Sequence, residues 1–372
     1  MPGSTDALIV GGGPAGLAAA IALRQRNIGC VVVEALPPAI DKACGEGLMP
    51  NALSALESLG VQITDEDGYP FRGIRFANAA HQVDAQFPEG YGVGVRRIRL
   101  HERLALRAHR CGVNILWNSR VTLLDRGMSS IDGTQIAFRW LIGADGQGSF
   151  VRRWAGLDQT RKKRLRYGFR RHYQIRPWSE FVEVHWGPGG QIYVTPVSPE
   201  SVCIVFVTAD LRDRSDILAS FPALRQRLSS APLLSQQRGA VSATRELSRV
   251  ADGTVALVGD ASGSTDAITG EGLAMSFRQA SALAEAIEAG SLAGYSRAHE
   301  RIGRLPHAMG SLMLTMDRWP SVEVRAMRAL SSNPELFREL LSVHLGMKGL
   351  FEFAMLRGPK LGWSLMTGSH HG

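Results

Sequence analysis

The scarcity of cysteine and lysine and the absence of a long apolar run set the first limits on this sequence. Cys30, Cys44, Cys111 and Cys203 lie far apart and form no Cys-x-x-Cys pair. Disulfides between four cysteines would stabilise a chain of 372 residues only weakly, so we expect reduced thiols in a cytoplasmic protein. The first residues show no secretory pattern, and no apolar run approaches the roughly 20 residues of a spanning helix, so we expect no membrane span.

Arginine supplies most of the positive charge. Only five of the 42 basic side chains are lysines and the other 37 are arginines, against 34 acidic side chains and a formal net charge of +8. Such an excess suits an anionic small molecule, a membrane surface or nucleic acid. No nucleic-acid-binding motif accompanies it, so we expect no nucleic-acid partner. The hydrophobic content of 45% and charged content of 20% exclude a disordered chain.

The chain opens with a βαβ pattern. An apolar run at residues 7–10 leads into glycines, residues 17–25 have helical character, and a second apolar run follows at 30–33. Continuous β-branched runs of this kind are typical of a parallel sheet buried on both faces. A similar strand returns at 254–259, and a helix is predicted over 272–289.

The middle of the chain has a different pattern. Apolar and polar residues alternate between 167 and 207 around a Gly-Pro-Gly-Gly turn, which indicates an antiparallel sheet. We therefore predict an α/β fold in which a doubly wound, Rossmann-like nucleotide-binding domain is interleaved with an antiparallel-sheet substrate domain. The predicted boundaries are 1–72, 96–160 and 250–297 for the first domain, 73–95 and 161–249 for the second, and 298–372 for a helical C-terminal region.

A dinucleotide motif lies at the first turn. Gly11, Gly13 and Gly16 form Gly-x-Gly-x-x-Gly directly after the first strand and at the start of a helix. The first glycine allows the tight turn, the second lets the backbone approach a pyrophosphate, and the third lets helix and strand pack closely. Glu34 ends the second strand, where an acidic side chain would bind the ribose hydroxyls of an adenosine. The pattern favours a dinucleotide over an unrelated glycine turn.

Three further segments resemble the flavin-dependent aromatic hydroxylases and their relatives. Residues 141–152 are similar to the Asp-Gly segment of that family, 258–261 to its Gly-Asp segment, and 97–100 to its arginine at the start of a helix. The resemblance implies FAD as the cofactor, with Arg97 at the phosphates and Asp145 near the pyrophosphate. For Asp145 the alternative is a turn aspartate.

The same resemblance points to the flavin end of the site. Asp260 would end a strand where a carboxylate can hold a ribityl hydroxyl, with a helix cap as the alternative. Gly270 and Gly272 would open a helix whose N-terminal amides face the N1/C2 edge of the flavin. That edge gains negative charge on reduction, so the positive helix end would stabilise the reduced flavin.

Two local details are similar to the geranylgeranyl reductase branch of this superfamily. Residues 42–48 read KACGEGL and residues 266–272 read DAITGEG, in which Ala267 replaces that branch's proline. The aromatic motif usual in such reductases is mostly missing at 189–196, where only Tyr193 keeps a ring. The branch therefore does not fix the reaction.

Two reactions stay open for such a flavoprotein. Reduced flavin can react with oxygen and hydroxylate a substrate, or pass a hydride to a carbon–carbon double bond. We favour a monooxygenase acting on a small apolar or aromatic molecule, with the double-bond reductase as the alternative. A halogenase is disfavoured because Lys42, the only lysine before Lys162, is poorly placed for that role. A flavin-fold protein that binds without turnover is the non-enzymatic alternative.

The electron donor is not encoded in a domain of its own. No second Gly-x-Gly-x-x-Gly motif is present, so NAD(P)H would bind transiently, or an external reductase would supply the electrons. We predict no metal site, and the oligomeric state stays open.

Three side chains are candidates for catalysis. Cys44 would lie beside the flavin or be a small buried residue. Glu46 would orient its loop or face the substrate, or else be a solvated loop residue. Tyr193 would hydrogen-bond the substrate or fill the sheet. His172 could act as an acid or base, although a lone histidine more often has a structural role.

One basic segment and one methionine-rich segment each have several interpretations. The cluster at 161–176 would guide an anionic donor or a substrate carried on coenzyme A or an acidic carrier protein. We favour the alternative, a solvated strand edge whose charges discourage pairing. The methionine-rich region from 308 to 366 would fill a core or form a lid. Contact of 345–363 with a membrane surface, with Arg357 and Lys360 at the headgroups, is the interpretation we favour least.

Overall fold

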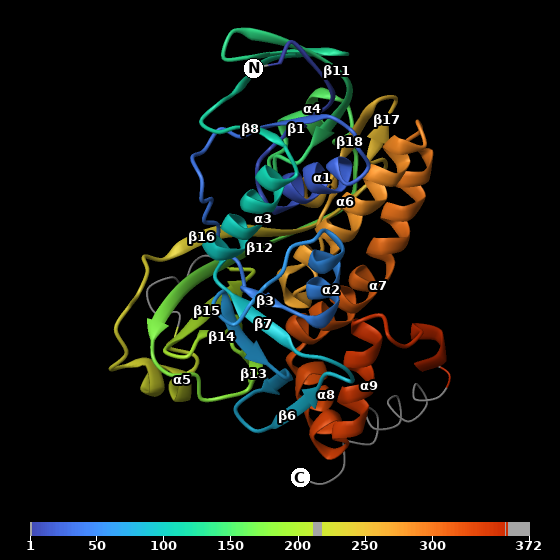
Figure 1. The fold of residues 1–372 in the computed structure, drawn as a ribbon. Coiled ribbons are helices and arrows are strands. Elements are labelled where there is room, and N and C mark those ends of the chain that lie inside the picture. Colours follow the sequence, from blue (N-terminus) through green and yellow to red (C-terminus); the bar gives the residue numbers. More distant parts are fainter. Residues whose placement is uncertain (1, 211–217, 354, 356–372) are drawn as a thin grey trace.

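The structure is a computed structural model that describes residues 2–210, 218–353 and 355 (Figure 1). Its nucleotide-binding half is an eight-stranded sheet with a parallel centre in the order β18-β11-β1-β2-β8. Strands β17, β10 and β9 continue it in antiparallel fashion. The strands are β1 Ser4–Val10, β2 Cys30–Val33, β8 Asn114–Leu116, β9 Val121–Asp125, β10 Met128–Ile131, β11 Thr134–Gly143, β17 Ala251–Asp252 and β18 Val255–Leu257.

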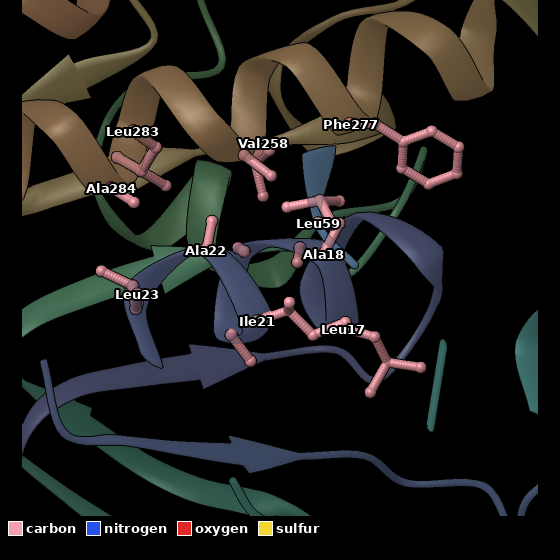
Figure 2. Close-up of a cluster of buried hydrophobic side chains, with 14 of the residues drawn as sticks. Leu17, Ala18, Ile21, Ala22, Leu23, Leu59, Val258, Phe277, Leu283 and Ala284 are labelled. Atoms are coloured by element: carbon pink, nitrogen blue, oxygen red, sulfur yellow. The ribbon is translucent and has the colours of Figure 1, made fainter. Parts of the chain in front are cut away.

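Helices cover one face of this sheet, and the β9–β10 hairpin with α4 covers the other. Helix α1 is apolar around most of its circumference because it lies between the sheet and α6. Figure 2 shows its leucines and alanines packed beneath α6, where the small alanines allow close approach of the two helices. The helices of this half are α1 Pro14–Arg24, α2 Pro50–Ser58, α3 Arg97–Arg110, α4 Phe150–Trp154 and α6 Gly272–Glu288.

The second half is a seven-stranded sheet in the order β16-β12-β15-β14-β13-β5-β6. All neighbours are antiparallel except β13 and β5, which run parallel. Helix α5 (Pro222–Leu228) covers its outer face. The strands are β5 Gly73–Ala77, β6 Gln82–Gln86, β12 Thr160–Gln174, β13 Phe181–Gly187, β14 Gly190–Ser198, β15 Ser201–Thr208 and β16 Arg238–Leu247.

A small third sheet links the two halves. It consists of β3 (Gly47–Leu48), β7 (Gly92–Val95) and β4 (Gly68–Phe71). The expectation that all of 73–95 joins the large antiparallel sheet is therefore wrong for β7. This strand lies across β14 instead, and it can approach so closely because Gly94 has no side chain that would collide with the Pro196 carbonyl.

Helices α7 (Ala293–Arg318), α8 (Pro320–Ser332) and α9 (Pro334–His344) follow α6 and close the inner face of the seven-stranded sheet. Their apolar side chains share one buried cluster with β5, β13, β14 and β15. In the described part of the chain no helix has both the length and the apolar composition needed to cross a membrane. The predicted fold, a Rossmann-like domain with a substrate sheet and a helical C-terminus, is confirmed.

Candidate functional site: a cofactor cradle and an apolar pocket

The three motif glycines occupy three different environments. Gly11 has a positive φ of +111°, and a Cβ there would collide with the Ala144 carbonyl. A Cβ at Gly16 would collide with the Gly11 carbonyl, so this glycine allows α1 to start tightly against β1. Gly13 differs, since no protein atom lies within 4 Å of its Cβ position. Its backbone therefore faces open space at the N-terminus of α1.

Two acidic residues near this turn bond to the backbone. The Glu34 carboxylate accepts the Gly12 amide at 2.7 Å and the Leu36 amide at 2.9 Å, which leaves further lone pairs for a ribose. Asp145 accepts the amides of Phe150 and Val151 at 2.6 and 3.1 Å. Asp145 thus binds the backbone at the start of α4, whose N-cap residue is Ser149. Its contact with a pyrophosphate stays a prediction.

Arg97 and Asp260 lie on the same open side. The Arg97 Nε is buried and has no hydrogen-bond partner in the described structure. Asp260 follows β18 and has an exposed side chain. Desolvation by the surrounding protein raises the pKa of Asp260, whereas the positive charges of Arg97 and Lys42 act to lower it. A carboxylate and two cations therefore surround this space.

The flavin end is formed by the start of α6. Gly270 adopts a left-handed conformation with φ of +66°, and no protein atom lies within 4 Å of the Cβ position of Gly272. Between them Glu271 is buried and bonds to Asn51 Nδ2 at 2.8 Å and Arg278 Nη2 at 3.0 Å. The bonds of the Glu271 carboxylate to Asn51 and Arg278 fix this loop on the protein side. The amides at the N-terminus of α6 are left facing open space.

These residues fit FAD. An elongated, doubly phosphorylated cofactor needs open space, found here beside Gly13, Gly45 and Gly272. It also needs a cation, and Arg97 is half-buried with an Nε that has no partner in the described structure. Gly13 and the α1 N-terminus would bind the pyrophosphate, and Glu34 would bind the ribose. Arg97 and Asp260 would hold the phosphates and ribityl chain, and the α6 N-terminus would face the flavin.

Glu46 lies in a buried ionic cluster beside the cofactor space. It is 2% exposed, with a positive φ of +61°. Its carboxylate accepts the Arg97 amide at 3.0 Å and Arg170 Nη1 at 2.9 Å, and lies 2.7 Å from His172 Nε2. Burial opposes its charge, but the His172 hydrogen bond and the neighbouring donors outweigh burial and lower the pKa of Glu46. The interpretation of Glu46 as a solvated loop residue is therefore wrong.

The cluster continues to the surface through Asp41. Arg170 binds both Asp41 oxygens, at 2.7 and 2.9 Å, and the half-exposed Arg238 binds the same carboxylate at 2.7 Å. On the other side, His172 Nδ1 lies 2.8 Å from Ser235 Oγ. The network ties the loop before β3 to β12 and β16.

The solvated-edge interpretation of 161–176 is wrong for its inward-facing residues. Strand β12 lies between β15 and β16, and Arg166, Arg170 and His172 alternate along one face with exposed fractions of 0–1%. Arg166 binds Asp266 at 2.9 Å, and it also bonds to Gln191 and Asp317. Carboxylates from distant parts of the chain thus neutralise the arginines. The side chains of Lys162 and Lys163 lie outside the described structure.

One triplet has the donor atoms of a metal site. Glu46, His172 and Cys203 bring an oxygen, a nitrogen and a sulfur within 4.8 Å of one another. However, burial raises the pKa of the Cys203 thiol, whereas a metal ligand must be the thiolate. Arg170 already neutralises Glu46 from 2.9 Å. We therefore assign the triplet to the ionic cluster.

An apolar pocket lies between the seven-stranded sheet and helices α7–α9. It encloses about 1120 Å³ of empty volume, part of it open to solvent. Gly45, Gly47 and Gly270 lie on its cofactor side. The other walls are aliphatic, aromatic and methionine side chains, among them Met49, Phe71, Phe76, Met309, Met316 and Phe337. Such a pocket suits a largely apolar molecule placed against the flavin.

Tyr193 differs from the other polar residues of the described wall, Thr195, Thr269 and His344, whose side chains are hydrogen-bonded within the protein. It lies on β14 beside Val205, and its hydroxyl is buried without a hydrogen-bond partner in the described structure. Arg170 on β12 also pairs with Val205. A row across the sheet therefore passes from the ionic cluster through Val205 to Tyr193, and on to Val184 and Phe76. The tyrosine marks the point where the polar part of the sheet meets the apolar pocket.

Cys44 is placed differently from Tyr193. Its thiol is half-buried and accepts the Glu46 amide at 3.5 Å. Gly45 and Gly47 line the pocket, but Cys44 is not among the lining residues. Its catalytic role stays a prediction.

The ionic cluster was not predicted from the sequence, nor were two histidine hydrogen bonds that hold the cofactor loops. His101 Nε2 donates to the Gly12 carbonyl at 2.9 Å. His344, at the end of α9, donates to the Thr269 carbonyl at 2.8 Å. A period-two pattern of residues 166, 168, 170 and 172 was the one available signal for the cluster. Nothing in the sequence indicated the partners of the two histidines.

The cluster predicts acid sensitivity. Hydrogen bonds from arginine and histidine lower the pKa values of Asp41 and Glu46, although burial opposes this. Their stabilisation is present above the ordinary carboxyl pKa of about 4 and is lost as the pH falls through the lowered values. We expect the free energy of unfolding, measured by urea titration from neutral to acidic pH, to fall steeply below about pH 4.

A glutamine variant tests the origin of this slope. Glu46→Gln is expected to be less stable at neutral pH and to lose less stability on acidification. The control is Glu89→Gln, at an exposed position, which should reproduce the wild-type curve. Equal slopes for the wild type and Glu46→Gln would contradict the assignment.

The fold and the cofactor cradle together define a class, the dinucleotide-binding flavoproteins with a substrate pocket closed by a second sheet. The chain belongs to the FAD binding domain family, whose profile matches residues 4–296. It is thus a member of the FAD-dependent oxidoreductases.

Relatives of this chain are named for different reactions. Menaquinone reductase of Mycobacterium tuberculosis is 27% identical over 78% of either chain. Digeranylgeranylglycerophospholipid reductase of Methanothrix thermoacetophila is 26% identical over 97% of this chain and 98% of its own. Ubiquinone hydroxylase UbiL of Rhodospirillum rubrum is 26% identical over 78% of this chain and 73% of its own.

Solved structures share the fold. A flavoprotein/dehydrogenase from Cytophaga hutchinsonii superposes with a TM-score of 0.83 at 19% identity, over 99% of this chain and 100% of that one. The flavin-dependent brominase Bmp2 gives 0.77 at 17% identity, over 92% and 94% of the two chains. At these identities the likeness concerns the fold alone.

Proposed function

We propose that the protein is an FAD-dependent monooxygenase that hydroxylates a largely apolar aromatic or quinoid molecule carrying at least one ring oxygen. The observation that carries this proposal is the apolar pocket with one buried, unpartnered hydroxyl, that of Tyr193. A buried polar group without a partner is costly, so a ligand that supplies the partner is favoured. A phenol or quinone oxygen has this chemistry, and the ring and any alkyl chain would occupy the apolar walls.

The proposed reaction has a simple balance. Substrate C–H, O₂, NAD(P)H and a proton give C–OH, water and NAD(P)⁺. When bound, FAD supplies the hydride acceptor and the site of oxygen activation. The chain excludes water with the methionine and phenylalanine walls and orients the substrate by Tyr193. Burial raises the pKa of Tyr193, so its hydroxyl stays protonated and can donate a hydrogen bond.

The second candidate is reduction of a carbon–carbon double bond. The relatives named menaquinone reductase and digeranylgeranylglycerophospholipid reductase favour it. Adding a hydride to one carbon requires a proton for the other. The pocket wall, as far as the structure describes it, contains no carboxyl or thiol group. His344 is bonded to the Thr269 carbonyl, and Tyr193 is a weak acid. Oxygen insertion needs no such donor at the substrate carbon, which is why we rank it first.

Oxygen dependence tests the choice. The purified protein would be supplied with NADH or NADPH and with long-chain alkylphenols or prenylated naphthoquinones. We expect substrate-dependent oxygen uptake and a product heavier by one oxygen, which carries the label from ¹⁸O₂. Anaerobic turnover to a product heavier by two hydrogens would replace our proposal with the reductase. Halogenation is disfavoured, because no lysine lines the described pocket wall.

Tyr193→Phe is expected to weaken substrate binding while leaving the fold intact. Loss of one hydrogen bond of about 1 kcal/mol should raise KM roughly fivefold, with a smaller change in kcat, because the bond is present before and during the reaction. The variant should be at least as stable as the wild type, because it removes an unpaired buried hydroxyl. Steady-state kinetics and thermal unfolding measure both effects.

A second buried tyrosine provides the matched control. The Tyr295 hydroxyl donates to the Leu257 carbonyl at 2.5 Å and lies outside the pocket. Tyr295→Phe should therefore lower stability by about 1 kcal/mol with no change in KM. An unchanged KM in Tyr193→Phe would remove Tyr193 from the substrate site.

A further inference from the structure

The segment after α9 leaves a group of large apolar side chains uncovered. Phe351 is 79% exposed and Met355 65% exposed, and three more side chains nearby are between 44 and 47% exposed. Large apolar side chains that gather on a surface mark an interaction site. We call this group the mouth patch; it consists of Leu312, Met347, Leu350, Phe351 and Met355.

The mouth patch is continuous with the substrate pocket. Leu312 on α7 lines the pocket and is also 47% exposed, so the pocket reaches the surface at this residue. Leu305 lies two turns earlier on the same face of α7, and its Cδ2 is 4.0 Å from the Cβ position of Gly346. Phe353 of the segment that begins at Gly346 also shares a buried apolar cluster with Met313, which lines the pocket beside Leu312. The segment therefore lies next to the pocket wall.

Arginines accompany the mouth patch along α7. Arg297, Arg301 and Arg304 are exposed and recur at helical spacing on the stripe that leads to Leu312. None of the three forms an ion pair within the described residues. Lys348, with 48% of its side chain exposed, lies within the patch segment, and its ammonium is 4.0 Å from the Glu339 carboxylate. Apolar side chains flanked by exposed arginines are the composition that binds at a lipid–water interface.

We propose that the mouth patch docks on an anionic lipid surface, so that a lipid-soluble substrate passes from the bilayer into the pocket. The step from surface to substrate rests on the proposed function. Charge complementarity favours lipid over a second copy, since a symmetric contact would bring two sets of the same arginines together. Residues 356–363 of the predicted membrane segment, with Arg357 and Lys360, lie outside the described residues and are not needed here.

Vesicle sedimentation tests the proposal with the full, flavin-loaded chain and no turnover. The vesicles consist of phosphatidylcholine alone or of phosphatidylcholine and phosphatidylglycerol in equal parts. We expect the wild type to bind the mixed vesicles more tightly and to be released by salt. Failure to bind the mixed vesicles at low salt would overturn the proposal.

Two sets of substitutions separate the apolar and the charged contributions. Leu350→Ser with Phe351→Ser should weaken binding to both vesicle types about tenfold or more. Arg297→Gln, Arg301→Gln and Arg304→Gln together should weaken binding to mixed vesicles about 100-fold, at about fivefold per charge, with little effect on neutral vesicles. Leu123→Ser is the matched control. Leu123 is 61% exposed on β9, in the sheet at the opposite end of the molecule (Figure 1), and its variant should bind like the wild type.

Four further outcomes are decisive. Retained flavin absorbance shows that a variant has folded, and a folded Leu350→Ser/Phe351→Ser variant that binds like the wild type contradicts the proposal. A wild-type dimer that ignores vesicles and becomes a monomer in this variant would assign the patch to a second copy instead. Vesicle binding without oxygen-dependent turnover would support the docking surface and reject the monooxygenase. Oxygen-dependent turnover without vesicle binding would support the monooxygenase and reject the docking surface.

Discussion

Gly13→Leu is expected to give a folded protein that contains no flavin. The backbone at Gly13 has an ordinary φ of −69°, and no protein atom lies within 4 Å of its Cβ position. A leucine there strains nothing in the protein but fills the space that the pyrophosphate needs, at the positive end of α1. We expect at least a 100-fold loss of FAD affinity, on the order of 3 kcal/mol. Flavin absorbance and circular dichroism measure cofactor and fold separately.

Substitutions at two other glycines serve as comparisons for Gly13→Leu. Gly294→Leu adds the same side chain in equally open space near the start of α7, away from the cradle, and should retain flavin. Gly16→Ala should fail to fold, because its Cβ collides with the Gly11 carbonyl. A fully flavinated Gly13→Leu protein would show that the cofactor lies elsewhere.

Arg170→Met is expected to be among the most destabilising substitutions outside the cofactor cradle. It removes the cation between Glu46 and Asp41, and Glu46 is left charged with no exposed side-chain surface. Removing one partner of a buried ion pair costs about 3–5 kcal/mol. With an unfolding entropy of about 2 cal/mol/K per residue, this lowers Tm by about 4–6 °C. Differential scanning calorimetry measures the shift.

Neighbouring substitutions show whether charge or packing is responsible. Arg171→Met changes the next residue of β12, which is half-buried and bonds to Gln237, and should shift Tm by less than about 1 °C. Arg170→Lys keeps the charge but loses the two-pronged contact with Asp41, so it should recover only part of the stability. Equal effects of the methionine variants at 170 and 171 would contradict the ionic explanation.

Local signals were sufficient for much of the fold. The turn from Gly11 to Gly16 is specified locally, because Gly16 must avoid the Gly11 carbonyl and Gly11 must avoid the Ala144 carbonyl at the end of the adjoining strand. Helix α6 was predicted over 272–289 from the sequence, within a residue or two of its bounds. Strand β7 was misassigned because Gly92 and Gly94 fit any sheet. Its partners were chosen by a close approach to Pro196, about a hundred residues away.

The candidate site was harder to predict than the fold, because it is formed by contacts between residues far apart in the sequence. Arg166 and Arg170 resemble solvated residues in the sequence. Their burial is made possible by carboxylates from other parts of the chain, among them Asp266 and Asp41. The pocket could not be predicted either, because its walls come from β5, β14 and α7–α9, which no local pattern connects. Tyr193 was identified through resemblance, and its unpaired hydroxyl emerged only with the structure.

Helix α7 limits how new specificities can arise in this protein. Its 26 residues span about 39 Å, from Tyr295 against the nucleotide-binding sheet to Met316 in the pocket wall. A transplanted substrate sheet, residues 161–249, would therefore arrive without half of its binding surface. Recombination that keeps α7–α9 together with their own sheet should yield working chimeras. Exchange of the sheet alone should yield enzymes that bind FAD and lack a matched pocket.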